Sequence, residues 1–428
     1  MKKYDKYKNS GVEWLGEIPE HWNFIRMKHL FKDHSEKNKP SEELLSVTQN
    51  QGVVPRSWVE NRMVMPSGAL ESFKFIQKGD FAISLRSFEG GLEYCHHDGI
   101  ISPAYTVLKT KRKIAEQYYK YLFKSFSFIS ELQTSVVGIR EGKNISYPEL
   151  SYSFLPVPNI EEQTAIAHFL DDKTSKIEQA IGIKQKQIEL LKERRQILIH
   201  KAVTRGLNDD VKLKDSGVEW IGEIPEHWDI VKIKHISSKI GSGVTPSGGG
   251  TTYLESGIPL LRSQNILFGK IELEGVAFIS DKVHTSMSNS QVKKGDVLLN
   301  ITGGSIGRCH FVDFDSELNV NQHVCIIRPT KEITTIFLNS VLSSEIGQGQ
   351  IWYNQQGGGR EGLNFQSIKN FYLPLPPISE QYSICNFIEQ STNKFATAIS
   401  LKEQEIEKLK EYKMSLIDGV VTGKVKVC

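Results

Sequence analysis

The sequence predicts an α+β protein with an internal pseudo-twofold repeat, in which two globular mixed α/β heads are separated by a pair of long antiparallel helices forming a coiled coil. Two short motifs that each occur twice, and a long helical stretch after each copy of the second motif, carry this prediction. At 428 residues the chain is long enough for several hydrophobic cores. Its 39% hydrophobic and 24% charged residues are typical of an ordinary folded protein.

The two repeated motifs define the modules. The first reads SGVEWLGEIPEHW at 10–22 and SGVEWIGEIPEHW at 216–228, with a single difference and an offset of 206 residues. The second reads FLPVPNIEEQTAIAHFL from Phe154 and YLPLPPISEQYSICNFI from Tyr372, at an offset of 218 residues. Self-similarity of this length excludes chance and indicates two tandem modules.

The segments between the motifs differ at most positions, while their flanks nearly agree. This pattern indicates one scaffold that carries two different recognition heads. We therefore divide the chain into an amino-terminal part of a distal conserved region (1–22), a first head (23–153), a central conserved helical region (154–228), a second head (229–371) and a distal conserved helical region (372–428).

The GEIPEHW box and the LPxPxxxEQ box followed by a long helix, each present twice, resemble the conserved regions of the specificity subunits of type I restriction-modification enzymes. The resemblance covers the whole chain. It implies that the heads are target-recognition domains for double-stranded DNA, one for each half of a bipartite, asymmetric site. It also implies two methyltransferase (modification) subunits as partners, and two motor-nuclease (restriction) subunits in the full complex. A complex that only methylates, and a coiled-coil scaffold that binds proteins alone, stay open as alternatives.

An apolar periodic stretch follows each Pro-rich box, from Glu162 to Thr204 and from Glu380 to Thr422. Gly206 and Gly423, which follow these stretches, suit a helix stop. The two apolar seams agree position by position, which indicates that the helices pack on each other. The basic residues at core heptad positions of both copies either disfavour wrong pairings or reach toward solvent. The two seams read Ile181, Lys184, Ile188, Leu191, Arg195, Leu198 and Ala202, and Ile399, Lys402, Ile406, Leu409, Lys413, Leu416 and Val420.

The order of the segments predicts how the helices run. Because the first helix starts after one head and ends before the box that introduces the other, a pseudo-twofold relation makes the helices antiparallel and brings the chain ends together. A helix of about 30 residues is roughly 45 Å long. This is near the roughly 34–36 Å of one DNA turn, so the helix pair is expected to act as a spacer ruler. Packing without a ruler role is the alternative.

The heads share landmarks, namely KGD at 78–80 and 294–296 and REGKN and REGLN at 140–144 and 360–364, which predict a common fold with a curved sheet. Bases are read by Arg, Asn and Gln side chains on loops. The candidates are Gln49, Asn50, Arg86, Ser87, Arg140, Lys143 and Asn144 in the first head, and Arg262, Gln264, Asn265, Thr302, Ser305, Arg308, Arg360 and Asn364 in the second. Arg140 and Arg360, which are shared, favour phosphate or structural roles.

Four tryptophans of the copied box, Trp14, Trp22, Trp220 and Trp228, are expected either to pack internally or to anchor a partner. His21 and His227 in the same box have no Ser or Cys at a fixed spacing, so we interpret them as structural.

No catalytic residue, metal site or cofactor is expected. A nuclease site built on Glu141 and Lys143 is disfavoured, because the second copy has Leu363 in place of the lysine. The chain has no methyltransferase box and no complete phosphate-binding loop. Its five cysteines form no CxxC pair, which favours reduced thiols over a zinc site.

The formal net charge of +3 says little about the partners of the chain, since it is too small to indicate a nucleic-acid binder. The sequence shows no signal peptide and no run of 18 apolar residues. A cytoplasmic location is therefore expected, with no membrane association.

Overall fold

A computed structural model describes residues 2–59, 69–137, 144–246, 253–355 and 362–427. The chain forms two compact units. The first unit combines residues 1–185 with 403–428, and the second unit holds residues 186–402. Each unit contains one head and a part of each long helix.

The copied box folds as the same β-hairpin in both units. Strand β1 (Tyr7–Asn9) pairs with β2 (Glu17–Pro19) in the first unit, and β15 (Leu213–Asp215) pairs with β16 (Glu223–Pro225) in the second. The amides of Ser10 and Ser216 donate to the carbonyls of Gly16 and Gly222, at 3.0 Å in both copies. These glycines have φ angles of 60° and 70°, a region that glycine adopts most readily.

Two strands that pair with each other lie at the borders of each head, one at its start and one directly after its end. In the first unit β3 (Asn23–Arg26) pairs antiparallel with β14 (Phe154–Val157), and in the second β17 (Asp229–Lys232) pairs in the same way with β28 (Tyr372–Leu375). The chain therefore leaves the scaffold and returns to it at neighbouring strands.

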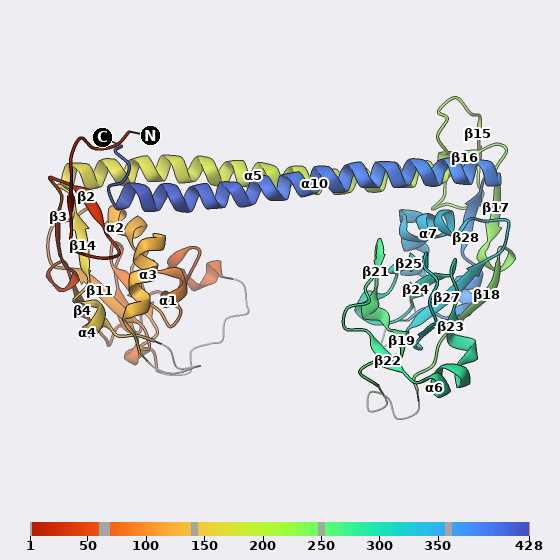
Figure 1. The fold of residues 1–428 in the computed structure, drawn as a ribbon, viewed down its shortest axis with the longest axis horizontal. Helices are drawn as coiled ribbons and strands as arrows, with labels where there is room; N and C mark the ends of the chain where they lie inside the picture. The colour runs from red at the N-terminus through yellow and green to blue at the C-terminus, as the bar shows by residue number, and fades with distance from the viewer. Residues whose placement is uncertain (1, 60–68, 138–143, 247–252, 356–361, 428) are drawn as a thin grey trace. The chain divides into compact units, whose positions relative to one another are not determined.

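The heads have the same central sheet, with four antiparallel strands in equivalent order (Figure 1). In the first head the order is β4 (Phe31–His34), β11 (Thr106–Thr110), β8 (Phe81–Ile83) and β9 (Glu93–Tyr94). In the second it is β18 (Ser237–Ser242), β27 (Val324–Pro329), β24 (Val297–Asn300) and β25 (Cys309–Phe311). The common fold predicted from the landmarks is confirmed.

Outside this sheet the heads differ. The first head has the two-stranded pairs β5 (Leu45–Thr48) with β6 (Gly52–Pro55), β7 (Lys74–Ile76) with β10 (Gly99–Ile101), and β12 (Val136–Val137) with β13 (Asn144–Ile145). The second has a mixed sheet of β22 (Ala277–Ile279), β19 (Ile258–Leu261), β26 (Leu318–Val320) and β23 (Gln291–Val292). Both heads carry two successive helices, α2 (Glu116–Leu122) and α3 (Phe126–Thr134), and α7 (Thr335–Ser343) and α8 (Glu345–Tyr353).

The KGD landmark is a structural turn that leads into β8 and β24. The Asp80 carboxylate accepts from the Gln77 amide at 2.9 Å, and Asp296 accepts from the Lys293 amide at 2.7 Å. Asp296 also pairs with Arg328 of β27 at 2.7 Å. These buried carboxylates therefore serve the turn and the sheet.

The long helices are α5 (Ile160–Arg205) and α10 (Ile378–Val421). In the first unit Lys184 Nζ contacts Glu405 at 2.5 Å and Lys413 Nζ contacts Glu178 at 2.5 Å, so the helices run antiparallel there. Every residue of the two predicted seams is buried or partly buried. The long helices and their antiparallel packing are confirmed.

Both helices stop at a glycine in the left-handed region, as predicted. Gly206 directly follows α5 with a φ of 74°, and Gly423 follows the end of α10 with a φ of 79°.

The chain ends lie together in the first unit (Figure 1). The Lys426 amide donates to the Lys2 carbonyl at 2.9 Å within an antiparallel bridge. The Tyr4 hydroxyl donates to Glu162 Oε1 of α5 at 2.7 Å. The predicted proximity of the two ends is confirmed.

In the parts of the chain that the structure describes, no helix is both long enough and apolar enough to cross a membrane. Cys95, Cys309, Cys325 and Cys385 are buried free thiols.

Candidate nucleic-acid interface

The glutamine of the EQ pair joins each long helix to its head. Gln163 Oε1 accepts from the Ala115 amide at 2.9 Å, and Gln381 Oε1 accepts from the Thr334 amide at 2.7 Å. Both glutamines are buried, and their amide groups also donate to main-chain carbonyls of the Pro-rich box. Each head is therefore fixed to the start of its helix by the same buried side chain.

The glutamate beside it binds the histidine of the copied hairpin. Glu162 Oε2 lies 3.0 Å from His21 Nε2, and Glu380 Oε1 lies 2.6 Å from His227 Nε2. The two repeated motifs thus contact each other in both units. This geometry supports the structural role predicted for the histidines.

Two of the four tryptophans pack internally. Trp22 and Trp228 are 0% exposed. A β-carbon on Gly423 would lie 3.1 Å from the Trp22 ring, and one on Gly206 would lie 3.2 Å from the Trp228 ring. Each indole therefore covers the glycine that ends a long helix. Of the two roles expected for these residues, the geometry favours packing over partner docking.

The other two tryptophans lie nearer the surface. Trp14 is partly buried against Phe128, with ring centroids 5.7 Å apart. Trp220 is 43% exposed and lies beside Tyr353, with ring centroids 6.1 Å apart. Trp220 consequently has the surface that a docking anchor requires.

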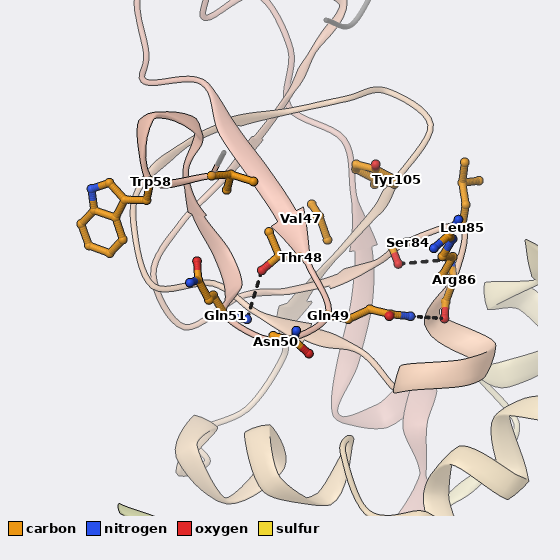
Figure 2. Close-up of a pocket in the computed structure, with 11 residues that line it drawn as sticks. Val47, Thr48, Gln49, Asn50, Gln51, Trp58, Ser84, Leu85, Arg86 and Tyr105 are labelled. Carbon is orange, nitrogen blue, oxygen red and sulfur yellow. Dashed lines mark hydrogen bonds between the residues drawn. The ribbon is translucent and has the colours of Figure 1, made fainter. Parts of the chain in front are cut away.

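Two predicted DNA-reading loops of the first head meet at one cavity (Figure 2). Gln49 and Asn50 are exposed at the turn between β5 and β6, and Arg86 is exposed just before α1 (Ser87–Gly90). The Gln49 amide donates to the Arg86 carbonyl at 3.4 Å. Ser87, in contrast, is buried and accepts from the Ser84 amide at 2.8 Å. Three of these four side chains can reach a ligand, whereas Ser87 holds the turn.

The cavity has a volume of about 700 Å³ and two aromatic lining residues, Trp58 and Tyr105. Figure 2 shows Trp58 on the opposite side from Arg86, and its side chain is 62% exposed. Asn144, from the third predicted loop, is exposed on β13, which contacts α1. The described parts of all three loops therefore gather at one end of the head.

A lysine behind these loops connects them. Lys124 Nζ donates to the carbonyls of Gln49 (3.2 Å) and Gly90 (2.8 Å) and to Glu93 Oε1 (2.7 Å). Glu93 is 0% exposed, and its burial raises the pKa of the carboxyl from 4.5 to about 7 against the opposing effect of Lys124. An ion pair thus lies beneath the candidate surface.

In the second head the first predicted loop divides into a structural part and an exposed part. Asn265 is buried, accepts from the Arg262 amide at 3.0 Å and donates to the Glu272 carbonyl at 2.9 Å. Arg262 is partly buried and donates to the Gly275 carbonyl at 3.3 Å, whereas Gln264 is exposed. Gln264 is therefore the most accessible side chain of this loop.

The second and third loops of this head adjoin each other. Thr302 forms an antiparallel bridge with Gly362, and its hydroxyl lies 2.7 Å from His323 Nδ1. Asn364 is exposed and caps α9 (Phe365–Lys369) by accepting from the Ser367 amide at 2.7 Å. Thr302 and Asn364 thus lie on neighbouring segments, as Arg86 and Asn144 do in the first head.

Ser305 and Arg308 follow Thr302 and are partly buried. Asn300, which is buried at the end of β24, ties this loop to the first one by donating to the carbonyls of Ser263 (2.7 Å) and Ile266 (3.3 Å). Arg140, Lys143 and Arg360 lie outside the described residues.

The supporting residues were missed in the sequence. Asn300 occupies the position of Ser84 after the shared KGD turn, so a comparison of the heads contained that signal. Nothing in the sequence linked Lys124 to Gln49, because they come from distant segments. His323, which orients Thr302, is likewise distant in sequence from the loop it supports.

Comparison with known proteins finds similarity to type I specificity subunits. A family model described as the type I restriction modification DNA specificity domain matches residues 225–411. The chain is 26% identical to the type I restriction enzyme MjaVIII specificity subunit of Methanocaldococcus jannaschii, over 96% of this chain and 94% of that protein. The chain is therefore similar to a type I specificity subunit over nearly its whole length. It is also 26% identical to the EcoBI specificity subunit of Escherichia coli, over 79% of this chain and 71% of the relative.

Solved structures share the fold of this chain. One, described as the structural basis of complex assembly and conformational transition of a type I R-M system, matches 95% of this chain with a TM-score of 0.72 at 15% identity, and is covered over 99%. The HsdS subunit of Thermoanaerobacter tengcongensis matches 95% with a TM-score of 0.54 at 14% identity, and is covered over 98%. The sequence matches support a non-catalytic specificity subunit that recognises DNA for a type I restriction-modification system.

Proposed function

We propose that this specificity subunit reads a bipartite, asymmetric DNA site, with one head on each half-site. The observation that supports this is the pairing of one shared sheet with two different sets of loop side chains. The first head presents Gln49, Asn50 and Arg86 where the second presents Gln264 and Thr302. Amide and guanidinium groups discriminate base edges by paired hydrogen bonds, so different sets select different sequences.

Among the candidates, we assign base reading to the described side chains that are exposed or partly exposed. These are Gln49, Asn50, Arg86 and Asn144 in the first head, and Arg262, Gln264, Thr302, Ser305, Arg308 and Asn364 in the second. Lys143 joins the first set from its sequence alone, and Arg140 and Arg360 are assigned phosphate or structural roles. Ser87 and Asn265 have internal partners and are assigned to loop support.

The helix pair and the repeated boxes form the proposed docking platform for two methyltransferase subunits, with two motor-nuclease subunits in the full complex. The exposed Trp220 supports a docking role for the second hairpin. The proposed borders of the functional segments are 1–22, 23–153, 154–228, 229–371 and 372–428.

Replacing one head tests whether each head recognises one half of a bipartite DNA site. Residues 23–153 would be exchanged for the corresponding head of another specificity subunit, and methylated adenines would be mapped in host DNA. The exchange replaces β3 and keeps its partner β14, and because strands pair through main-chain hydrogen bonds, the first strand of another head can take the place of β3. We expect one half-site to change and the other to persist. Exchange of 229–371 is the matched control, and a change of both half-sites in either variant contradicts the proposal.

We further propose that the helix pair sets the number of unspecified base pairs between the half-sites. Four residues would be inserted after Gln185 and four at the facing point after Glu403, which nearly preserves the seam because about 3.6 residues make a turn. The helices would lengthen by about 6 Å, equal to about two base pairs at roughly 3.4 Å each. We expect methylation mapping to return both half-sites with a spacer longer by one or two. An unchanged spacer in an assembled variant contradicts the ruler.

A further inference from the structure

We propose that Lys124 is a positioning residue for sequence reading by the first head, because its ammonium group fixes the loop of Gln49 and Asn50 against the loop of Arg86. The inference rests on the proposed function, in which these loops read bases. It assigns the selectivity of one half-site in part to a side chain that makes no base contact.

The geometry uses the full donor capacity of the lysine. An ammonium group has three protons, and Nζ has three acceptors: the Gln49 carbonyl, the Gly90 carbonyl and Glu93 Oε1. One acceptor belongs to the first loop, one to the turn that follows Arg86, and one to strand β9 of the central sheet. A single side chain therefore attaches both loops to the sheet.

The loops also touch directly at this point. A β-carbon on Gly90 would lie 3.1 Å from Gln49 Nε2, and the same amide donates to the Arg86 carbonyl. The Gln49 and Arg86 side chains reach the cavity from these two segments (Figure 2). Movement of either loop would change the separation of two groups that must meet fixed base edges.

The anchor of the lysine is rigid and deep. Glu93 is fully buried on β9, opposite Ala82 of β8, whereas 27% of the Lys124 side chain is exposed. The carboxylate thus holds the ammonium from the core side, and the carbonyl acceptors lie toward the loops. A hydrogen bond that involves a charged group is stronger than a neutral one, which suits a link between flexible segments.

The second head supports the same region with neutral groups. Gln348 Nε2 donates to the carbonyls of Gly307 (2.9 Å) and Leu342 (2.8 Å), and the Asn300 amide joins the first loop to the sheet. By the offset of the shared KGD turn, Gly307 corresponds to Gly91, the neighbour of Gly90. Each head therefore has its own support beneath a similar set of loops.

The test measures half-site discrimination by the complete complex with its methyltransferase subunits. Three duplexes would be compared: the mapped target, the target altered in the half-site of the first head, and the target altered in the other half-site. The first discrimination ratio is the affinity for the target divided by the affinity for the duplex altered in the half-site of the first head, and the second ratio uses the other altered duplex. For Lys124→Met we expect the first ratio to fall about tenfold, the equivalent of one charged hydrogen bond. The second ratio, the affinity for unrelated DNA and its salt dependence should stay unchanged.

Three further variants separate positioning from folding. Glu93→Gln keeps the lysine contacts to both loops and is expected to retain most of the discrimination. The double variant Lys124→Met/Glu93→Gln leaves no unpaired buried charge, and is expected to lose discrimination while folding normally. Lys124→Arg, which keeps several donors, should restore part of it. Equal discrimination in the double variant and the wild type would overturn the proposal.

Lys120→Met is the matched charge control, since Lys120 lies one turn earlier and pairs with Asp171 at 3.2 Å, away from the loops. A uniform affinity loss with a smaller salt slope in Lys124→Met would identify a phosphate contact and also overturn the proposal. Gln49→Ala and Arg86→Ala report on the proposed function itself. If these two alter the first half-site and the lysine variants do not, only the positioning role fails.

Discussion

The two units build one scaffold in the same way but support their loops differently. In both, the EQ pair joins the helix to the head and the hairpin, and a tryptophan covers the glycine that ends a long helix. Beneath the loops, the first head has the Lys124–Glu93 ion pair and the second has the amides of Asn300 and Gln348. The contacts that hold a head in place are therefore repeated, whereas those that shape its proposed reading surface are specific to each head.

The largest expected difference between the two units is in how their stability depends on pH. Burial raises the pKa of Glu93 to about 7, so the folded carboxyl binds its proton more tightly than the unfolded one. The stability of the first unit should therefore decrease as the pH rises from about 4.5 to about 7, by at most about 3 kcal/mol. Above that range the titration of this group should change the stability no further. Hydrogen exchange of the first unit across this range would measure the slope, and Glu93→Gln should abolish it.

The residue at the equivalent strand position in the second head should give its unit the opposite dependence of stability on pH. His310 on β25 faces Leu298, as Glu93 on β9 faces Ala82, and burial lowers the pKa of its imidazole. The folded state therefore binds this proton less tightly, so the stability of the second unit should increase as the pH rises toward the ordinary histidine pKa of about 6.5. Equal slopes for both units would refute the comparison.

A smaller difference in stability between the units is expected when their buried tryptophans are replaced. Trp228 Nε1 donates to Glu380 Oε2 at 3.0 Å, whereas Trp22 Nε1 has no acceptor among the described residues. Trp228→Phe should therefore destabilise its unit by about 1 kcal/mol more than Trp22→Phe destabilises the other. Denaturant unfolding followed by hydrogen exchange in each unit would measure both costs. Equal costs would show that the indole hydrogen bond contributes nothing.

The smallest effect is expected on the helix pair. Lys413 pairs with Glu178, but the equivalent positions in the second unit are Arg195 and Ala396, and Arg195 Nε has no acceptor in the described chain. Ala396→Glu should stabilise the second unit by less than about 1 kcal/mol, and high salt should weaken the effect. Ala396→Gln is the uncharged control. A gain of the same size in both variants would exclude an ion pair.

The sequence predicted the scaffold because its signals are local or repeated. The copied box, the apolar seam and the stop glycines were all visible without knowledge of the fold. The strand order of the heads was not, since β11 lies between β4 and β8 through contacts distant in sequence. Residue type on a loop likewise indicated Gln49, Arg86 and Gln264 as candidates. It could not reveal that Ser87 and Asn265 turn inward, because their roles depend on neighbouring backbone groups.

The bridge between Lys2 and Lys426 makes the first module discontinuous along the chain. Tyr118 of the first head donates from its buried hydroxyl to the Val421 carbonyl, and Asp418 accepts from the Ser127 amide at 2.8 Å. Loss of the last dozen residues would therefore damage the head that is synthesised first and spare the one that is synthesised second. The first head can complete these contacts only after Asp418 and Val421 have been synthesised, which is later than the whole second head. Co-translational folding should thus finish the second module before the first.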